Sequence, residues 1–288
     1  MSRNISLLVI LLLLLAHPAG SIEKPRIYFG INLRYHPVAV YKLYQPMLDY
    51  LTANTPYRFE MKLSRNYREA LKFLREGKVQ IFSLGDGAVV EAMAAYGAIP
   101  LVKPLNDEGA PFYRCVFVAS DDSPIRSLKD LKGRKVAFGY RHSTTGNLVA
   151  HQLLAENGIG RGELAAADNL KNHEAVMKAV MKGEFDAGAV KEVIARQYLN
   201  RGIRVIATSA PIAAIPLVAA RNTPEHVTQA VTDALLRLDV NNPAHRKILA
   251  TWDAEFRNGF AAAFPADYRE LSRQFRSRPY GCGTRCHR

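Results

Sequence analysis

Three consecutive hydroxyl residues, Ser143, Thr144 and Thr145, stand between a predicted strand (residues 135–139) and a predicted helix (residues 148–157). At such a junction, free backbone N–H groups, the positive end of the helix and side-chain hydroxyls can face one oxyanion. The alternative is that a single hydroxyl simply caps the helix. Because a cap needs one hydroxyl and the sequence supplies three, anion binding is the favoured interpretation of this hydroxyl triplet.

The elements that must position the triplet alternate between short β-rich runs and helical stretches, which predicts an α/β fold with largely parallel sheets. Strands are predicted over residues 26–33, 58–63, 79–84, 99–102, 113–119, 135–139, 187–191, 204–208 and 217–220. Helices are predicted over residues 38–51 and 66–76. The second of these opens with Asn66 and Glu69 in the spacing of a capping box and stops at Gly77.

Two segments of the chain are echoed later in the same order. Residues 26–30 resemble residues 135–139, and residues 71–81 resemble residues 177–187. Helix–glycine–strand junctions are common, but two echoes in order favour two lobes with a shared plan. We expect a first lobe of residues 22–112 and 212–288 and a second lobe of residues 113–211. The crossings between them are expected near residues 103–111 and 209–216, and the ligand in the cleft that both sheets border.

The first 21 residues predict export. Arg3 precedes an apolar run over residues 5–16, and Pro18, Ala19 and Ser21 follow it. A basic start, a short apolar core and a small-residue exit are typical of a cleavable signal peptide. An uncleaved anchor is the alternative, but a bilayer-spanning helix needs about 20 apolar residues. We therefore expect a signal peptide of residues 1–21 and a soluble, monomeric periplasmic protein.

Composition narrows the class of partner. The 288 residues are 48% hydrophobic and 23% charged, with a formal net charge of +13. Nucleic acid is a poor partner for an exported protein, so this basic character fits attraction of small anions, an acidic partner or a membrane surface. The alternative, a property of the surface without functional meaning, stays equally open.

The sequence from residue 123, SPIRSLKDLKGRKVAF, followed by STTGNLV at residues 143–149, resembles the phosphonate-binding proteins of bacterial ABC transporters. The resemblance runs from Ile27 to about Leu238 and is strongest over residues 123–158. It implies a two-lobed Venus-flytrap fold of the periplasmic-binding-protein type, with two hinge crossings. It also implies capture of a small phosphorus oxyanion (phosphonate, phosphite or phosphate) and its delivery to a membrane transporter.

The same resemblance implies a set of ligand-binding residues. Ser143, Thr144 and Thr145 match the residues that hold the phosphonate oxygens, and His173, Glu192 and Tyr44 match other positions around the ligand. Each has a plainer alternative. His173 and Glu192 could lie at the surface, and Tyr44 could be a core residue on the stripe of its predicted helix, which is the favoured interpretation.

Two positions depart from the family pattern. Leu84 replaces an aromatic residue before Gly85, and an acid expected near the second crossing falls on Ala214 or a neighbour. The site for an amine tail therefore looks altered, which leaves an aminoalkyl phosphonate in doubt. Asp86 is expected to cap a helix, because a carboxylate repels an anion.

Other classes of function find little support. The chain has no G-x-S-x-G, H-E-x-x-H or P-loop motif and no paired-cysteine zinc spacing, so we expect neither an enzyme nor a metal or other cofactor. A sensor input for a membrane histidine kinase and an enzyme of the same fold stay open as alternatives. Near the end of the chain, Cys282 and Cys286 are expected to form a local disulfide rather than to attach haem.

Overall fold

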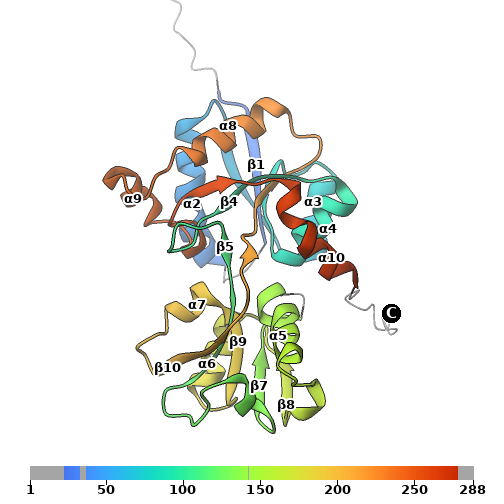
Figure 1. Ribbon diagram of the computed structural model, residues 1–288. Helices are drawn as coiled ribbons and strands as arrows, with labels where there is room; N and C mark the ends of the chain where they lie inside the picture. Colours follow the sequence, from blue (N-terminus) through green and yellow to red (C-terminus); the bar gives the residue numbers. More distant parts are fainter. Residues whose placement is uncertain (1–22, 33–36, 142, 278–288) are drawn as a thin grey trace, which may run out of the picture.

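The computed structural model describes residues 23–32, 37–141 and 143–277. They form two α/β lobes, one above the other, joined by extended connections (Figure 1). The predicted signal peptide and the Cys282–Cys286 pair lie outside the described residues. Within the described ranges, no helix combines the length and apolar character that a membrane span requires.

The first lobe is built on a six-stranded sheet of order β13-β4-β12-β3-β1-β2. Strand β1 is parallel to β2 and β3, whereas β12 is antiparallel to β3 and β4, and β13 is antiparallel to β4. The strands are β1 (Arg26–Asn32), β2 (Arg58–Ser64), β3 (Ile81–Ser83), β4 (Ile99–Pro104), β12 (Leu217–Ala219) and β13 (Phe260–Ala262). The helices are α2 (Pro37–Asn54), α3 (Tyr67–Arg75), α4 (Asp86–Tyr96), α8 (Glu225–Leu236), α9 (Pro243–Leu249) and α10 (Arg269–Ser277).

The second lobe is built on a five-stranded sheet of order β10-β6-β9-β7-β8. Strand β7 is parallel to β8 and β9, whereas β6 is antiparallel to β9 and β10. The strands are β6 (Cys115–Ser120), β7 (Lys135–Phe138), β8 (Ala166–Asn169), β9 (Ala187–Lys191) and β10 (Ile203–Thr208). The helices are α5 (Ala150–Glu156), α6 (His173–Met181) and α7 (Glu192–Arg196).

The sheets are mixed, so the prediction of largely parallel sheets is wrong. The reason lies in the connections between the lobes. Strands β6 and β12 are the first strands of the large sheets after each crossing, so the chain enters them from the edge of the sheet that faces the other lobe. They run away from that edge, while β7 runs toward it (Figure 1), and an antiparallel pairing results. The short strands β8, β11 (Ile212–Ala213) and β13 were not predicted.

The two connections form a small ribbon of their own. Strand β5 (Phe112–Tyr113) pairs antiparallel with β11, with Tyr113 opposite Ile212. The first crossing lies later than expected, because Lys103 still belongs to β4. The lobe limits at residues 112 and 211 stay predictions, since β5 and β11 belong to neither large sheet.

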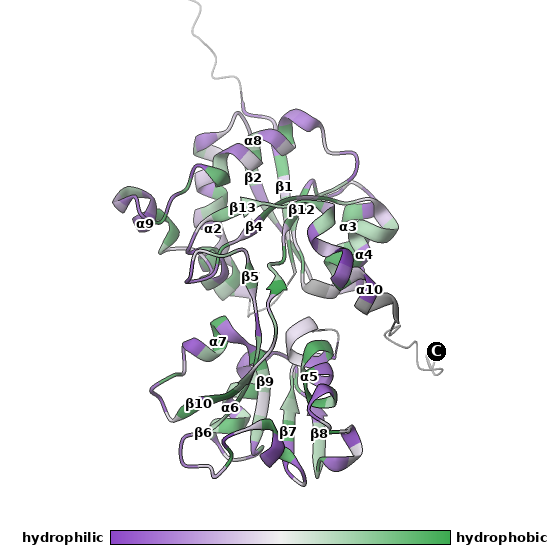
Figure 2. Ribbon diagram, viewed as in Figure 1, coloured by the Kyte–Doolittle hydropathy of each residue, from purple (hydrophilic) through white to green (hydrophobic). Residues whose placement is uncertain are grey.

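The apolar faces of the helices cover the sheets. Figure 2 shows apolar strands inside each lobe and polar residues on the outer helix surfaces. In α2, the buried side chains are Val40, Tyr44, Met47, Leu48 and Leu51. Burial of a large apolar side chain of this kind contributes about 1.5–3 kcal/mol, so the α2 face alone is a substantial part of the first core.

The echoed helices begin and end alike. The Asn66 side chain accepts a hydrogen bond from Glu69 N, 2.9 Å away, and the Asn172 side chain accepts one from Ala175 N, at 2.8 Å. Both helices are followed by a glycine in the left-handed region, Gly77 (φ 65°) and Gly183 (φ 70°). The N-cap predicted for Asn66 is confirmed, although the Glu69 carboxylate bonds to Arg65 N instead of completing a capping box.

Close packing between β9 and α6 gives a test of the second lobe. A methyl group at Gly188 would overlap Val176 Cγ1 and lie 3.0 Å from Val180 Cγ2. We expect Gly188→Ala to lower the free energy of unfolding by about 1–3 kcal/mol, because the core would be overpacked. Gly162→Ala is the matched control, since an added methyl there has no atom within 4 Å. Urea denaturation measures both, and equal stability of the two variants would contradict the packing.

Candidate functional site

The hydroxyl triplet begins a π-helical turn, Thr144–Val149, that continues into α5. Ser143 is the N-cap, and its Oγ accepts a hydrogen bond from Gly146 N at 3.1 Å. Leu148 N donates to Ser143 O at 3.1 Å, which is the wider spacing of a π turn. Ser143 therefore meets the capping need by itself, and the two threonine hydroxyls are left for another purpose.

Thr144 and Thr145 are buried polar residues, 0% and 1% exposed. Among the described residues, neither Oγ1 atom has a hydrogen-bond partner. A buried hydroxyl without a partner destabilises the fold by about 1–3 kcal/mol. These two adjacent hydroxyls lie just after β7, at the end of the strand that points toward the first lobe (Figure 1), and both can donate to an anion.

His173 lies against the same turn. Gly139 N donates to Gly146 O at 2.7 Å, so the two ends of the loop touch. A methyl group at Gly146 would lie 2.8 Å from Gly139 Cα and 2.9 Å from His173 Cε1. The structure thus brings His173, the first residue of α6, together with the hydroxyl triplet. Its contact with a ligand stays a prediction.

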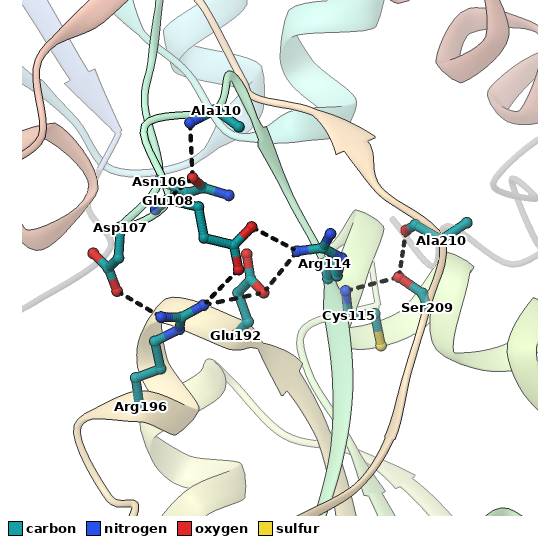
Figure 3. A network of polar contacts seen from close by, with 10 residues as sticks. All are labelled: Asn106, Asp107, Glu108, Ala110, Arg114, Cys115, Glu192, Arg196, Ser209 and Ala210. Carbon is teal, nitrogen blue, oxygen red and sulfur yellow. Dashed lines mark hydrogen bonds and ion pairs between the residues drawn. The ribbon is translucent and has the colours of Figure 1, made fainter.

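Glu192 follows β9 as the first residue of α7 and is 8% exposed. Its Oε2 lies 3.7 Å from Arg114 Nη1 and 4.0 Å from Arg196 Nη2 (Figure 3). Within the described part of the chain, Oε1 has no hydrogen-bond partner. Burial raises the pKa of this carboxyl, and the two guanidinium groups oppose that shift.

The same arginines extend this contact into a charge network at the connection between the lobes. Arg196 Nη1 lies 3.1 Å from Asp107 Oδ2, and Arg114 Nη1 lies 3.8 Å from Glu108 Oε2 (Figure 3). A ligand ammonium group at Glu192 would compete with two guanidinium groups. The role of Glu192 toward a ligand stays a prediction.

A buried ion pair next to Glu192 was missed by sequence reasoning. Lys191 Nζ lies 2.8 Å from Glu255 Oε1, and both side chains are largely buried. The ammonium also sits 4.2 Å from the centroid of the Tyr113 ring. Lys191 belongs to the second sheet and Glu255 to the segment Ala254–Phe256 before β13, so the pair joins the two lobes. The only signal was a charged residue ending the apolar run AGAVK.

The first-lobe residues fall in different places. Tyr44 is 1% exposed in the core, with its ring edge-on to Phe256 at 5.7 Å, as its core-packing alternative describes. Its contact with a ligand stays a prediction. The N-cap of α4 is Gly85, and Asp86 is the first helical residue, so the capping prediction for Asp86 is wrong by one position. Ala214 is buried beside β11. No cluster of metal-ligating side chains occurs among the described residues.

Comparison with known proteins points to one family. Residues 29–268 match the model of the family described as the phosphonate ABC transporter periplasmic substrate-binding protein. A phosphate-import protein of Mycolicibacterium smegmatis is 28% identical over 170 residues, covering 55% of this chain and 53% of that protein. A probable phosphite-binding ABC transporter protein of Prochlorococcus marinus is 25% identical over 171 residues, covering 50% and 54%. The chain thus matches about half the length of these curated relatives.

Solved structures share the fold. A binding protein of a phosphonate ABC transporter from Pseudomonas aeruginosa aligns with a TM-score of 0.73 at 24% identity, covering 88% of this chain and 86% of that one. The Prochlorococcus marinus protein solved in complex with methylphosphonate aligns with a TM-score of 0.74 at 20% identity, covering 88% and 98%. At these identities the likeness concerns the two-lobed fold.

The two threonine hydroxyls give a stability test. We expect Thr144→Val and Thr145→Val to leave the free energy of unfolding unchanged or to raise it by about 1 kcal/mol, because neither substitution breaks a hydrogen bond. Thr55→Val is the matched control: Thr55 is also buried, but its Oγ1 donates to Leu51 O at 2.7 Å. That variant should lose about 1–3 kcal/mol in urea denaturation. Equal losses in all three variants would contradict the assignment of free hydroxyls.

Proposed function

Because this chain belongs to the family of periplasmic substrate-binding proteins of phosphonate ABC transporters, we propose that it captures a small phosphorus oxyanion between its lobes and delivers it to an ABC transporter. The ligand class is phosphonate, phosphite or phosphate. The site of action is the periplasm, and the membrane partner is the permease of the transporter.

One observation carries the proposal: Thr144 Oγ1 and Thr145 Oγ1 are buried, adjacent and without partners among the described residues. An oxyanion offers several acceptor oxygens to such donors. Hydrogen bonds to a charged group are shorter and about twice as strong as those between neutral groups. Burying the two hydroxyls without partners destabilises the ligand-free protein. Hydrogen bonds to a bound anion recover this free energy, which favours a role in binding over a purely structural one.

The surroundings favour a compact ligand without an ammonium tail. Glu192 already faces Arg114 and Arg196, and the buried residue beside β11 is Ala214 rather than an acid. A cationic tail would find little uncompensated negative charge there. The names of the relatives fit this selection, since they refer to phosphate import, to phosphite binding and to a methylphosphonate complex.

Capture requires that the lobes close. The threonine hydroxyls belong to the second lobe, so an anion gains contacts from the first lobe only when the cleft shuts. A ligand shifts such an equilibrium by its differential affinity for the two states. The β5–β11 ribbon is the natural hinge, because it lies between the sheets and belongs to neither. The proposed role is binding without catalysis, in keeping with a transport family.

Removing both hydroxyls should weaken binding strongly. Each hydrogen bond to a charged group is worth about 1.5–3 kcal/mol, so the Thr144→Val/Thr145→Val variant should bind about 10²- to 10⁴-fold more weakly. Titration calorimetry with phosphate, phosphite, methylphosphonate and 2-aminoethylphosphonate measures the affinities. Thr251→Val, an exposed threonine, is the control.

Two outcomes separate the site from the function. If wild-type protein binds a phosphorus oxyanion and the double variant binds it equally well, the site assignment is wrong. If wild-type protein binds none of the four ligands, the proposed function itself is contradicted. Tightest binding of the aminoalkyl ligand would overturn the selection against an ammonium tail.

A further inference from the structure

Two tyrosine rings, one from each lobe, meet between the lobes. Tyr67 and Tyr140 are stacked with ring centroids 6.0 Å apart and ring planes only 10° from parallel. Tyr67 is the first residue of α3, which packs against β1, β2 and α4 of the first lobe. Tyr140 follows β7 of the second lobe and is 41% exposed. The Tyr67–Tyr140 pair is therefore a contact between lobes, on the side of the hydroxyl triplet.

The Tyr67 ring is held from its own lobe. Asn66 caps α3 and so fixes the residue that follows it. The phenol oxygen lies directly beside Gly85, where an added Cβ would overlap it. Because the N-cap of α4 is a glycine without a side chain, the Tyr67 ring can pack at this position. Tyr67 directly follows the N-cap of its helix, Asn66. In the second lobe, His173 directly follows the N-cap Asn172 in the same way.

The Tyr140 ring is held by the loop that carries the hydroxyl triplet. Tyr140 O accepts a hydrogen bond from Ser143 N at 2.7 Å, so a tight turn connects this residue to the triplet. The preceding residue, Gly139, is the one whose N–H donates to Gly146 O. Movement of the loop that carries Thr144 and Thr145 therefore moves the ring, and a fixed ring restrains the loop.

We propose that the Tyr67–Tyr140 pair is an aromatic latch that forms only in the closed protein and slows release of the bound anion. The part of the inference that concerns release rests on the proposed function. Parallel, offset aromatic pairs contribute a stabilisation equivalent to about two- to ten-fold in an equilibrium constant. The two rings sit on different lobes, so this stabilisation belongs to the closed state alone and appears in the rate at which the cleft reopens. Tyr67 and Tyr140 are thus positioning residues for closure.

Release rates test the latch. Protein loaded with radiolabelled phosphate is mixed with excess unlabelled phosphate, and the loss of label is followed in time. We expect Tyr140→Leu and Tyr67→Leu each to release phosphate about two- to ten-fold faster than wild type, with little change in the association rate. Tyr140→Phe and Tyr67→Phe keep the stacked rings and should retain slow release. Tyr41→Leu removes an exposed tyrosine of the first lobe and is the control.

The double variant isolates the contact between the rings. If the rings act through each other, Tyr67→Leu/Tyr140→Leu releases phosphate no faster than the quicker single variant, because the contact is lost only once. Strictly additive effects would show that the rings act separately and would overturn the latch. Release at the wild-type rate from both leucine variants would overturn it as well. Fast release from Tyr67→Phe alone would instead assign a direct role to the phenol oxygen.

A second readout traps the closed protein by cross-linking, and it is run with and without phosphate. Photo-oxidation with a ruthenium complex and persulfate removes one hydrogen from each of two neighbouring phenols and couples the rings. A cross-linked pair of tryptic peptides containing Tyr67 and Tyr140, two hydrogens lighter than their sum, is expected from wild type and not from either phenylalanine variant. Absence of this product from wild type would contradict the stack. If the product forms but no phosphorus oxyanion binds, the proposed function fails while the contact between the lobes stands.

Discussion

The backbone of Gly139 touches that of Gly146, and the geometry of the loop that carries the hydroxyl triplet depends on this one contact. Any side chain at Gly146 would collide with Gly139 Cα and with the His173 ring. The closed loop turns Ser143 into a cap for the helix and buries Thr144 and Thr145 without partners among the described residues. It also holds Tyr140 at the cleft, through the 2.7 Å bond from Ser143 N. The end of β7, the start of the helix, the His173 ring and Tyr140 therefore lie in one continuous set of contacts.

Charged side chains form a second set of contacts, at the connection between the lobes. Lys191 and Glu192 are adjacent, yet one pairs with Glu255 of the first lobe and the other faces Arg114 and Arg196. Burial raises the pKa of Glu192, so its ionisation is disfavoured in the folded protein. Its contribution to stability is present at low pH and is lost as the pH rises through the raised pKa. The charges of Arg196 and Arg114 reduce this rise in the pKa but do not cancel it. The Lys191–Glu255 ion pair thus joins the two lobes beside the connection that carries Asp107 and Glu108.

Much of this arrangement could be predicted from the sequence, for physical reasons that differ between elements. Strands such as β1 and β9 are buried apolar runs, and the caps at Asn66 and Gly77 are local, so both could be predicted. The hydroxyl triplet was visible because three hydroxyls exceed what a cap needs. Strand direction was missed, because an apolar run does not record whether its neighbour in the sheet runs parallel or antiparallel to it. Strands of two to four residues, such as β11 and β8, carry too little pattern. The Lys191–Glu255 pair and the stack of Tyr67 on Tyr140 join residues 64 or more positions apart, and no local signal records them.

The internal echo explains why the two faces of the cleft resemble each other. In each lobe an asparagine caps the helix and an aromatic ring follows it: Tyr67 in α3 and His173 in α6. In each lobe the next strand leads to a helix whose first residue is acidic: Asp86 in α4 and Glu192 in α7. Only the second lobe adds the hydroxyl triplet. The Tyr67 ring meets Tyr140 just before the hydroxyl triplet, and the His173 ring lies against Gly146 just after it. A shared plan thus places the helix caps and the rings of the two lobes alike, and the hydroxyl triplet distinguishes the second lobe.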